Sequence, residues 1–558
     1  MSFVGAALAG HAAARPDAVA LSCGARQLTY LALDAEIRAL ASTLAGALVV
    51  SEALSGAVLP FDGRDALTRQ PRVALDLADP LDLLVAFLAV VRAGAVALVL
   101  DPAWPAPRKA AIRAATAPAV YLDAARLSEL RRGPVPGTDW PQPSRDHLFY
   151  AGFTSGSTGE PKGYARSHRS WTDSFALSRQ IFAIGAEDHV LVPGSLAHSL
   201  HLYGAVEALH CGARVTLAES FRPGRLARGL AQSGITVLYA TPTQLVLMQR
   251  DIERLGLALP GLRLCLVSGA AWGAGEKASL RATLPHTRLA EFYGASEMSF
   301  LTLSADPQPA PIGSVGKPFP GVEISLRDEA GRDCGTAVLD NTGRTATGTI
   351  FVRSPLLFSG YICGGGTEVR WDGDFLTIGD RGWRDADGNL YLAGRDKRMF
   401  VSAGLNLFPE EAEQVLRDAD GVGLAAVFGA PDRLRGRVPV AAIVFEEESA
   451  PDPGYLRRLC LAALGRSRCP RRFHFFDAFP LTSGGKIDLP QLEALVLARE
   501  AARRSGCEAG PDTNLDTGPD TGPDTGPDTG PDTGHDCGHG TGLEDNRQSG
   551  PGSDGRRA

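Results

Sequence analysis

The sequence predicts an α/β protein: a large N-terminal domain of helix-covered, mostly parallel sheets with a β-rich subdomain, followed by a small α+β domain. Three observations predict it. Apolar runs of strand length alternate with helices up to about residue 270, short β segments follow residue 310, and 558 residues exceed what one hydrophobic core usually supports. We place the large domain at 1–394, the small domain at 395–500 and a disordered tail at 501–558.

The first strand–helix–strand unit lies between residues 73 and 101. "VALDL" (73–77) has the apolar content of a strand, and "PLDLLVAFLAVVRAG" (80–94) carries apolar residues at helical spacing before a terminating Gly. "AVALVLD" (95–101) is almost wholly apolar, as a buried parallel strand is. The alternation recurs in strands at 213–219, 235–242 and 262–270 and in helices near 223–233 and 243–255. Repeated units of this kind predict a parallel sheet covered by helices.

After about residue 310 the pattern changes to short β segments. "GVEISLRDEAGRD", "GTIFVRS" and "FLTIGDRGWRDADGNLYLAG" join apolar stretches through Gly and Asp turns, which is typical of antiparallel structure. "PEEAEQVLRDAD" (409–420) opens with Pro and acids, as helix N-termini do. Strands at "LAAVFGA" and "PVAAIVFEEE" and a helix at "DPGYLRRLCLAALG" complete the predicted α+β domain.

The negative charge of the chain is concentrated in its last residues. Gly-Pro-Asp-Thr occurs at 510–513 and four times in succession from Gly518 to Thr533, which predicts disorder because such sequence has nothing to bury. Residues 505–558 hold eleven acids and three arginines, a net −8, so the remainder carries +1 of the total −7. A near-neutral body gives no electrostatic reason to bind nucleic acid or a membrane surface. We expect the tail to be a spacer, with an interaction arm as the alternative.

Nine cysteines are scattered through the chain, without a C-x-x-C pair or a Cys/His cluster at zinc spacing. This pattern predicts free thiols and a reducing, cytoplasmic compartment. The N-terminus lacks a basic stretch followed by a long apolar run, so we expect no signal peptide. The longest apolar run, "LLVAFLAVVRAGAVALVL", is interrupted by Arg92 and Gly94, so we expect no transmembrane segment.

The stretch "FTSGSTGEPKG" (153–163) combines three glycines, four hydroxyl side chains and one lysine. Backbone N–H groups of a Gly-rich loop can converge on anionic oxygens, and a lysine supplies a cation for a phosphate. A Walker loop is excluded because it needs Gly-Lys-Ser/Thr opening a helix, whereas Lys162 lies between Pro161 and Gly163. The stretch therefore indicates a phosphate-binding loop, with a flexible surface loop as the alternative.

This pattern resembles the phosphate-binding loop of the adenylate-forming superfamily. That superfamily includes acyl-CoA synthetases, aryl-acid ligases, luciferases and the adenylation domains of peptide synthetases. Five further stretches resemble its motifs in the same order: "LAVVRAGAVALVLDPAWP", "EFYGASE" (291–297), "LTIGDRGWRDADGNLYLAGRDKR" (376–398), "NLFPEEAE" (406–413) and "PLTSGGKID" (480–488). The resemblance covers about residues 20 to 490.

The resemblance implies two half-reactions. A carboxylate attacks the α-phosphate of ATP to give an acyl-adenylate and pyrophosphate, and a thiol then displaces AMP. Lys486 would carry the first step, because its cation can bridge the attacking carboxylate and the α-phosphate. Lys162 would assist at the phosphates, and Glu297 would hold Mg²⁺, a hard cation suited to oxygen ligands. The implied cofactors are ATP, Mg²⁺ and coenzyme A, or carrier-protein phosphopantetheine in place of coenzyme A.

The remaining nucleotide contacts follow from the same resemblance. The β- and γ-phosphates would be bound by Thr154, Ser155, Gly156, Ser157, Thr158 and Gly159. Tyr293 would stack on adenine within a motif that also holds Gly294 and Ser296, where the serine keeps the hydroxyl of the usual threonine. Asp380 would accept hydrogen bonds from both ribose hydroxyls, and Arg395 would contact the ribose or the phosphates.

In the superfamily the small domain is mobile and rotates between the two half-reactions. Lys397 falls at the hinge position, where a few residues absorb the change in backbone angles. Gly404 would then face the incoming thiol arm. One departure is Thr349, which stands in place of an acid in a strand that we expect to be structural.

The acyl pocket begins at "AHS" (197–199), where peptide-synthetase domains carry an Asp for the substrate's α-ammonium. The absence of a carboxylate at that position disfavours an α-amino acid, whose ammonium would be buried unpaired. His198 matches a gating or pocket position, with a satisfied histidine in the first helical turn as the alternative. Ser199 and Gly269 would add to the wall. Small residues there leave room for an elongated or planar acid.

The superfamily's carrier segment does not follow the small domain, so we expect a free-standing enzyme. The leading hypothesis is an ATP-dependent carboxylate–thiol ligase that acts on a small-molecule carboxylic acid and forms its coenzyme A thioester. The alternative within this class loads an acyl or aryl acid onto a separate acyl carrier protein. Alternatives of other classes are a non-catalytic interaction protein with the same fold and a luciferase-type oxygenase.

Overall fold

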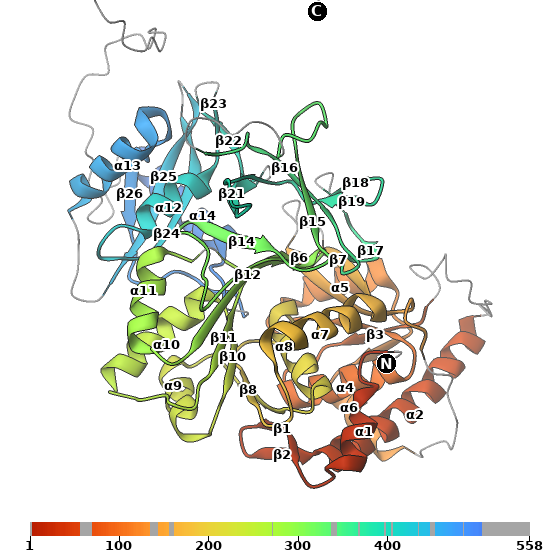
Figure 1. The fold of residues 1–558 in the computed structure, drawn as a ribbon. Coiled ribbons are helices and arrows are strands. Elements are labelled where there is room, and N and C mark those ends of the chain that lie inside the picture. Colours follow the sequence, from red (N-terminus) through yellow and green to blue (C-terminus); the bar gives the residue numbers. More distant parts are fainter. Residues whose placement is uncertain are drawn as a thin grey trace, which may run out of the picture. The chain divides into compact units, whose positions relative to one another are not determined.

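The computed structural model describes most of the chain, drawn in colour in Figure 1. The described residues are 3–55, 70–133, 143–155, 161–270, 272–335, 343–365, 369–395, 398–402, 405–432, 435–446, 452–483 and 485–504. Positions 156–159, 397 and 404 and the repeat tail lie outside them, so what the sequence indicates there stays a prediction. Ser155 is described by its backbone alone.

The first strand–helix–strand unit belongs to a sheet with the order β17-β7-β6-β4-β3-β5. Its strands are β3 (Arg72–Leu75), β4 (Val96–Val99), β5 (Val120–Leu122), β6 (Leu148–Ser155), β7 (Pro161–Ser167) and β17 (Gly360–Cys363). β3 pairs in parallel with β4 and β5, and β4 with β6, whereas β7 is antiparallel to both of its neighbours. α4 (Pro80–Arg92) begins after Asp79, whose carboxylate accepts a hydrogen bond from the Asp82 N–H at 2.8 Å. The unit predicted between residues 73 and 101 is confirmed.

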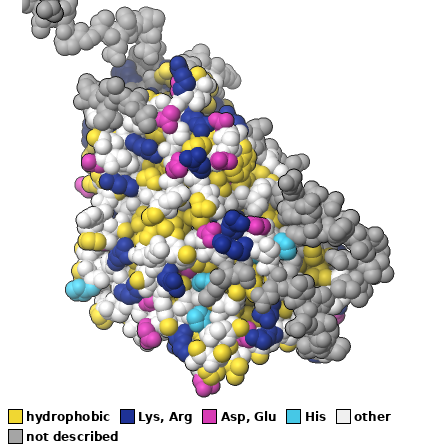
Figure 2. Space-filling model, turned by 45° about the vertical axis from the view of Figure 1, so that its right-hand side comes forward, with side chains coloured by type: hydrophobic (Ala, Val, Ile, Leu, Met, Phe, Trp, Pro, Cys, Tyr) yellow, Lys and Arg dark blue, Asp and Glu magenta, His cyan; other side chains and the backbone are white. Residues whose placement is uncertain are grey.

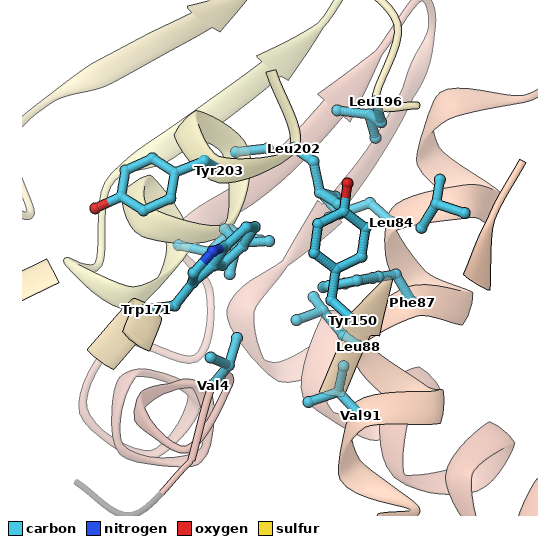
Figure 3. Close-up of a cluster of buried hydrophobic side chains, with 14 of the residues drawn as sticks. Val4, Leu84, Phe87, Leu88, Val91, Tyr150, Trp171, Leu196, Leu202 and Tyr203 are labelled. Carbon is cyan, nitrogen blue, oxygen red and sulfur yellow. The ribbon is translucent and has the colours of Figure 1, made fainter. Parts of the chain in front are cut away.

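Helix α4 is buried on nearly every side. In Figure 3, Leu84, Phe87, Leu88 and Val91 of this helix lie around Tyr150 of β6. The Phe87 and Tyr150 rings meet edge to face with centroids 5.9 Å apart. Because the helix lies inside the large domain, its sequence is apolar all round and lacks a polar stripe.

The second sheet continues the predicted alternation with parallel strands in the order β12-β11-β10-β8-β9-β1, closed by an antiparallel β2. These strands are β1 (Val19–Cys23), β2 (Arg26–Thr29), β8 (His189–Val192), β9 (Arg214–Leu217), β10 (Val237–Ala240), β11 (Leu264–Val267) and β12 (Arg288–Ala295). Helices cover both faces (Figure 1): α9 (Pro223–Gln232), α10 (Pro242–Arg254) and α11 (Ala274–Thr283) on one, and α7 (His168–Phe182) and α8 (Ser199–His210) on the other. Leu238 and Tyr239 alternate between these faces, as strand periodicity requires.

Beyond β12 the same sheet becomes antiparallel, in the order β12-β13-β14-β21-β20-β16-β19-β18, with β15 beside β16. The strands are β13 (Ser299–Ala305), β14 (Ser314–Pro318), β15 (Glu323–Arg327), β16 (Gly348–Arg353), β18 (Arg370–Asp372), β19 (Phe375–Thr377), β20 (Asp380–Arg384) and β21 (Leu390–Arg395). The predicted β-rich part is confirmed, and it extends the parallel sheet.

The C-terminal part has its own sheet, in the order β23-β22-β25-β24 with β26 parallel to β25. Its strands are β22 (Phe400–Ser402), β23 (Leu405–Leu407), β24 (Val422–Asp432), β25 (Gly436–Phe445) and β26 (Arg472–Phe475). α12 (Pro409–Arg417) and α13 (Pro453–Arg468) pack on one face, and α14 (Leu489–Arg504) packs on the other. The final helix runs four residues past the boundary predicted at 500. The division at 394/395 stays a prediction.

The remaining described helices are α1 (Ala7–Ala14), α2 (Tyr30–Ser55), α5 (Ala106–Thr116) and α6 (Ala124–Arg132). Among the described residues, no helix has the length and apolar character that crossing a bilayer takes. On the face drawn in Figure 2, Lys and Arg side chains are dispersed among acidic, apolar and other polar ones.

Candidate active site

The ends of the predicted phosphate-binding loop are held by two antiparallel strands. Thr154 of β6 lies opposite Lys162 of β7, and Ser155 lies opposite Pro161. Lys162 is 6% exposed, so the strand delivers a buried lysine to the base of the loop. The element after the loop is a strand, which agrees with the exclusion of a Walker loop.

Tyr293, Gly294 and Ala295 of the "YGASE" motif end β12, and Ser296 and Glu297 lie in the turn to β13. A Cβ on Gly294 would lie 2.1 Å from the backbone oxygen of Ser299, so this end of the strand accommodates only glycine. The hydroxyl oxygen of Ser296 lies 3.3 Å from that of Ser199 at the start of α8. The motif predicted to contact the nucleotide and the helix predicted to line the acyl pocket therefore meet at these two serines.

Glu297 follows in the same turn and is held from the neighbouring segment of β17. The Tyr361 hydroxyl donates to its Oε1 at 2.9 Å, and the Phe358 N–H donates to its backbone oxygen at 2.8 Å. Mg²⁺ in nucleotide sites is commonly held by one or two protein carboxylates together with phosphate oxygens. The oriented carboxylate fits such a role. In the part of the chain that the structure describes, no group of three or more His, Cys, Asp or Glu side chains could hold a metal ion by itself.

Tyr293, Asp380 and Arg395 form one cluster, in which Tyr293 and Asp380 are buried and the Arg395 side chain is half exposed. The Tyr293 hydroxyl donates to Asp380, and Arg395 Nε lies 2.7 Å from Asp380 Oδ1. Asp380 and Arg395 are opposite each other on β20 and β21, so backbone register sets their ion pair. Burial raises the pKa of Tyr293 well above its usual value, which keeps the phenol a hydrogen-bond donor. Ribose hydroxyls would share the Asp380 carboxylate with both neighbours.

The loop that carries Lys486 reaches into the large domain. Thr241 donates its hydroxyl to the Gly485 backbone oxygen at 2.9 Å, and the Ser195 N–H donates to Ser483 at 3.3 Å. A Cβ on Gly269 would lie 2.6 Å from Lys486 Cε, so the lysine side chain packs directly on that glycine. Burial, followed by the nearby charge of Arg395, lowers the pKa of Lys486 to about 8. The loop thus brings Lys486 to the cluster of Asp380 and Arg395.

His198, directly before α8, contacts the loop that carries Lys486. Its Nε2 lies 2.9 Å from the hydroxyl oxygen of Ser483, and Ser483 in turn donates to Asp101. Because the single hydroxyl proton goes to Asp101, the imidazole must donate through Nε2. Burial, with a smaller effect from Lys486, lowers the pKa of His198 to about 4, so the ring is neutral. His198 precedes the helix rather than lying in its first turn, and its side chain makes no capping bond.

Sequence reasoning missed Asp101 and Ser483, although both lie in quoted motifs. It also missed Glu207, two turns into α8, which is fully buried and accepts a hydrogen bond from Tyr239. Desolvation raises the pKa of Glu207 to about 7. The only signal in the sequence was an acid in a mostly apolar helix.

Comparison with known proteins agrees with this geometry. The sequence profile described as "AMP-binding enzyme" matches residues 64–362, and that of the "AMP-binding enzyme C-terminal domain" matches residues 411–486. The chain is 38% identical over 440 residues to the uncharacterised acyl-CoA ligase YhfT of Bacillus subtilis, covering 75% of this chain and 86% of that one. It is 29% identical over 339 residues to the 2-succinylbenzoate–CoA ligase of Enterococcus faecalis, covering 60% and 67%.

Solved structures share the fold. The o-succinylbenzoate CoA synthetase of Bacillus subtilis, in complex with its acyl-adenylate intermediate, has a TM-score of 0.71 at 22% identity, covering 87% of this chain and 97% of that one. MatB of Rhodopseudomonas palustris, solved with bound ATP, has a TM-score of 0.72 at 23% identity, covering 89% and 99%. The fold, the two profile matches and the identity to YhfT together show that the chain belongs to the AMP-binding enzyme family, the superfamily that its motifs resemble.

Proposed function

We propose that this protein is an ATP-dependent acid–thiol ligase that joins a small-molecule carboxylic acid to AMP and passes the acyl group to coenzyme A. One observation carries the proposal. The C-terminal loop places Lys486 against Gly269, close enough to Arg395 for the arginine charge to lower its pKa. A lysine held there stands beside the residues that the family's motifs associate with the nucleotide.

In the first half-reaction a carboxylate oxygen bonds to the α-phosphorus of ATP, and pyrophosphate leaves. Two anions approach each other, so positively charged groups must stabilise the transition state more than the bound substrates. Lys486 supplies that charge and favours the pentavalent transition state over the ground state. Thr154 and Lys162 bind the departing phosphates at the base of the 156–159 loop. Mg²⁺ bound at Glu297 would neutralise further charge on the triphosphate.

In the second half-reaction the deprotonated thiol attacks the acyl carbonyl carbon, and AMP leaves. Lys486 has no task in this step, and its loop would withdraw as the small domain turns about Lys397 and presents the Gly404 side. Coenzyme A is favoured as the acceptor because relatives that share much of the chain are named as CoA ligases. Loading of a carrier protein's phosphopantetheine is the alternative, since the reactive thiol is the same.

The test is carboxylate-dependent exchange of labelled pyrophosphate into ATP. The panel holds fatty acids of graded length, dicarboxylic acids and aryl acids, with a chelator control that removes Mg²⁺. We expect exchange with at least one acid, followed by release of AMP and a thioester when coenzyme A is added. A holo carrier protein in place of coenzyme A distinguishes the two acceptors. If the protein binds ATP but shows no pyrophosphate exchange with any acid, the non-catalytic alternative is favoured. Oxygen uptake or light emission would instead indicate an oxygenase.

We place the enzyme in the cytoplasm. The seven cysteines among the described residues are all free thiols, as a reducing compartment favours. Fractionation of cells that express the tagged protein tests the assignment, and recovery of the protein outside the cytoplasmic fraction contradicts it.

A further inference from the structure

Strand β7 carries a row of buried polar side chains on one of its faces. Lys162, Tyr164 and Arg166 alternate along the strand, and alternate residues of a strand point to the same side. All three are buried, with Arg166 only 2% exposed. Ala165, between them, packs into a separate apolar cluster on the opposite face. The strand that delivers Lys162 to the phosphate loop therefore also carries an arginine two positions beyond Tyr164.

The guanidinium of Arg166 connects two segments of the chain. Its Nη1 donates to the backbone oxygen of Ser296 at 3.1 Å, and its Nη2 donates to the backbone oxygen of Leu356 at 2.7 Å. Ser296 immediately precedes Glu297 in the turn between β12 and β13. Leu356 leads into the segment that contains Phe358 and β17.

Those two segments meet at Glu297. The Phe358 N–H binds the Glu297 backbone oxygen, and the Tyr361 hydroxyl binds its Oε1. Tyr361 is the cross-strand partner of Tyr164, so the donor to Glu297 and the row containing Arg166 belong to adjacent strands. Glu297 is thus held at its carboxylate, at its own carbonyl and, through Arg166, at the carbonyl just before it.

The guanidinium of Arg166 is buried without a carboxylate among its hydrogen-bond acceptors. Burying a charge is costly, and the two bonded acceptors of Arg166 are neutral carbonyls. Burial lowers the pKa of Arg166 to about 10, and the neighbouring Tyr164 and Glu297 oppose that shift. The planar fork of an arginine can reach two carbonyls at once, which a lysine cannot do. These two hydrogen bonds offset part of the cost of burying the guanidinium, and they hold the Ser296 and Leu356 segments in a fixed relation to each other.

We infer that Arg166, together with Tyr361, is a positioning residue that sets the Glu297 carboxylate for a nucleotide-bound divalent cation. The inference rests on the proposed function, in which Glu297 holds Mg²⁺. Neither residue is expected to touch the metal. Partners of this outer kind change metal affinity by about 10- to 100-fold when they are removed.

The test measures Mn²⁺ binding by electron paramagnetic resonance in the presence of a non-hydrolysable ATP analogue, which requires no acid substrate. Variants are Arg166→Gln, Arg166→Lys and Tyr361→Phe. Arg288→Gln is the control, because Arg288 also donates to two backbone oxygens, those of Ile181 and Asp306, at the opposite end of β12 from Ser296. We expect affinity for Mn²⁺ to fall about tenfold in Arg166→Gln, less in Arg166→Lys, and severalfold in Tyr361→Phe, with no change in the control.

The catalytic readout separates positioning from general damage. The Mg²⁺ concentration for half-maximal pyrophosphate exchange should rise by the same factor, while thioester formation from supplied acyl-adenylate stays within about twofold of the parent. Folded Arg166 variants with unchanged Mn²⁺ affinity would overturn the inference. If the arginine variants do not fold, unchanged affinity in Tyr361→Phe overturns it. Absence of exchange in the parent enzyme bears on the proposed function instead, because Mn²⁺ binding is measured without it.

Discussion

Lys486 packs directly against Gly269: a Cβ at that glycine would lie 2.6 Å from Lys486 Cε and 2.9 Å from its Nζ. Gly269 follows β11 at the carboxyl end of the parallel strands, which is where ligands bind in open α/β sheets. Its φ of +100° is also a conformation that side chains rarely adopt. The large domain thus leaves room for the lysine by having no side chain at this position.

Gly269→Ala should therefore exclude Lys486 from the site. We expect pyrophosphate exchange to fall about 100-fold, because small displacements of a catalytic group are costly, while thioester formation from supplied acyl-adenylate persists. Gly275→Ala is the matched control, since a Cβ at this α11 position meets nothing within 4 Å. An alanine at 269 that leaves exchange unchanged would contradict the close packing.

Lys486→Ala tests the assignment of the first half-reaction to this residue. Loss of the cation should abolish exchange, whereas thioester formation from supplied acyl-adenylate should survive, because that step needs no charge at the α-phosphate. The two half-reactions are measured separately on the same preparation. Equal loss of both would count against a loop that serves adenylation alone.

The lowered pKa of Lys486 predicts how adenylation depends on pH. Burial and Arg395 bring this pKa to about 8, so the free enzyme loses the cation as pH rises through that value. We expect kcat/KM for ATP in the exchange assay to fall above about pH 8. The value of kcat should persist to higher pH, because bound phosphates favour the charged amine. A kcat/KM that is flat from pH 7 to 9.5 would contradict the assigned role.

Much of the fold was predictable because strand–helix–strand units carry their burial in the sequence. Around α4 and from β9 to β11, short apolar runs of strand length alternate with longer stretches of helical spacing, and each boundary fell within a few residues. The continuity of the antiparallel strands with β12 was not predictable, because strand pairing depends on contacts distant in sequence. The same holds for Asp101 and Ser483, which are 382 positions apart and meet only in the folded chain.

The family resemblance assigned Lys486 to the α-phosphate and Gly269 and His198 to the acyl pocket, but it did not predict that Lys486 packs on Gly269. Arg166 and Glu207 escaped notice for a different reason. Each is a charged residue that becomes buried only in the folded chain, and nothing local in the sequence distinguishes it from a solvated side chain.

The hydrogen bonds of Ser483 predict a role in holding the Lys486 loop. Ser483→Ala removes both the bond to Asp101 and the contact with His198, and a bond to a charged group contributes about 1.5–3 kcal/mol. We expect pyrophosphate exchange to fall about tenfold, with thioester formation from supplied acyl-adenylate unchanged or faster as the loop leaves more readily. The exchange assay and the thioester assay give the two rates.

Asp101→Asn and the double variant complete that experiment. If the two side chains act through one bond, the double variant should lose no more than Ser483→Ala alone. Losses that add in full would show that Asp101 and Ser483 act independently. Asp101 also accepts the Ala103 N–H at 2.9 Å, so its own variant needs a check of folding by thermal unfolding.

The raised pKa of Glu207 predicts that the stability of the folded protein falls as pH rises through neutrality. The pKa of Glu207 is raised from 4.5 to about 7 by burial, so the folded protein binds the proton more tightly than the unfolded chain does. The corresponding stability is complete below about pH 4.5 and is lost as pH rises through 7, amounting to roughly 3 kcal/mol. Glu207→Gln stays neutral and can keep the hydrogen bond with Tyr239. Denaturant unfolding should therefore find the variant more stable than the parent at pH 8 and similar at pH 5. The exposed Glu129→Gln serves as control, and a variant less stable at pH 8 would show that the charged carboxylate is favoured by its surroundings after all.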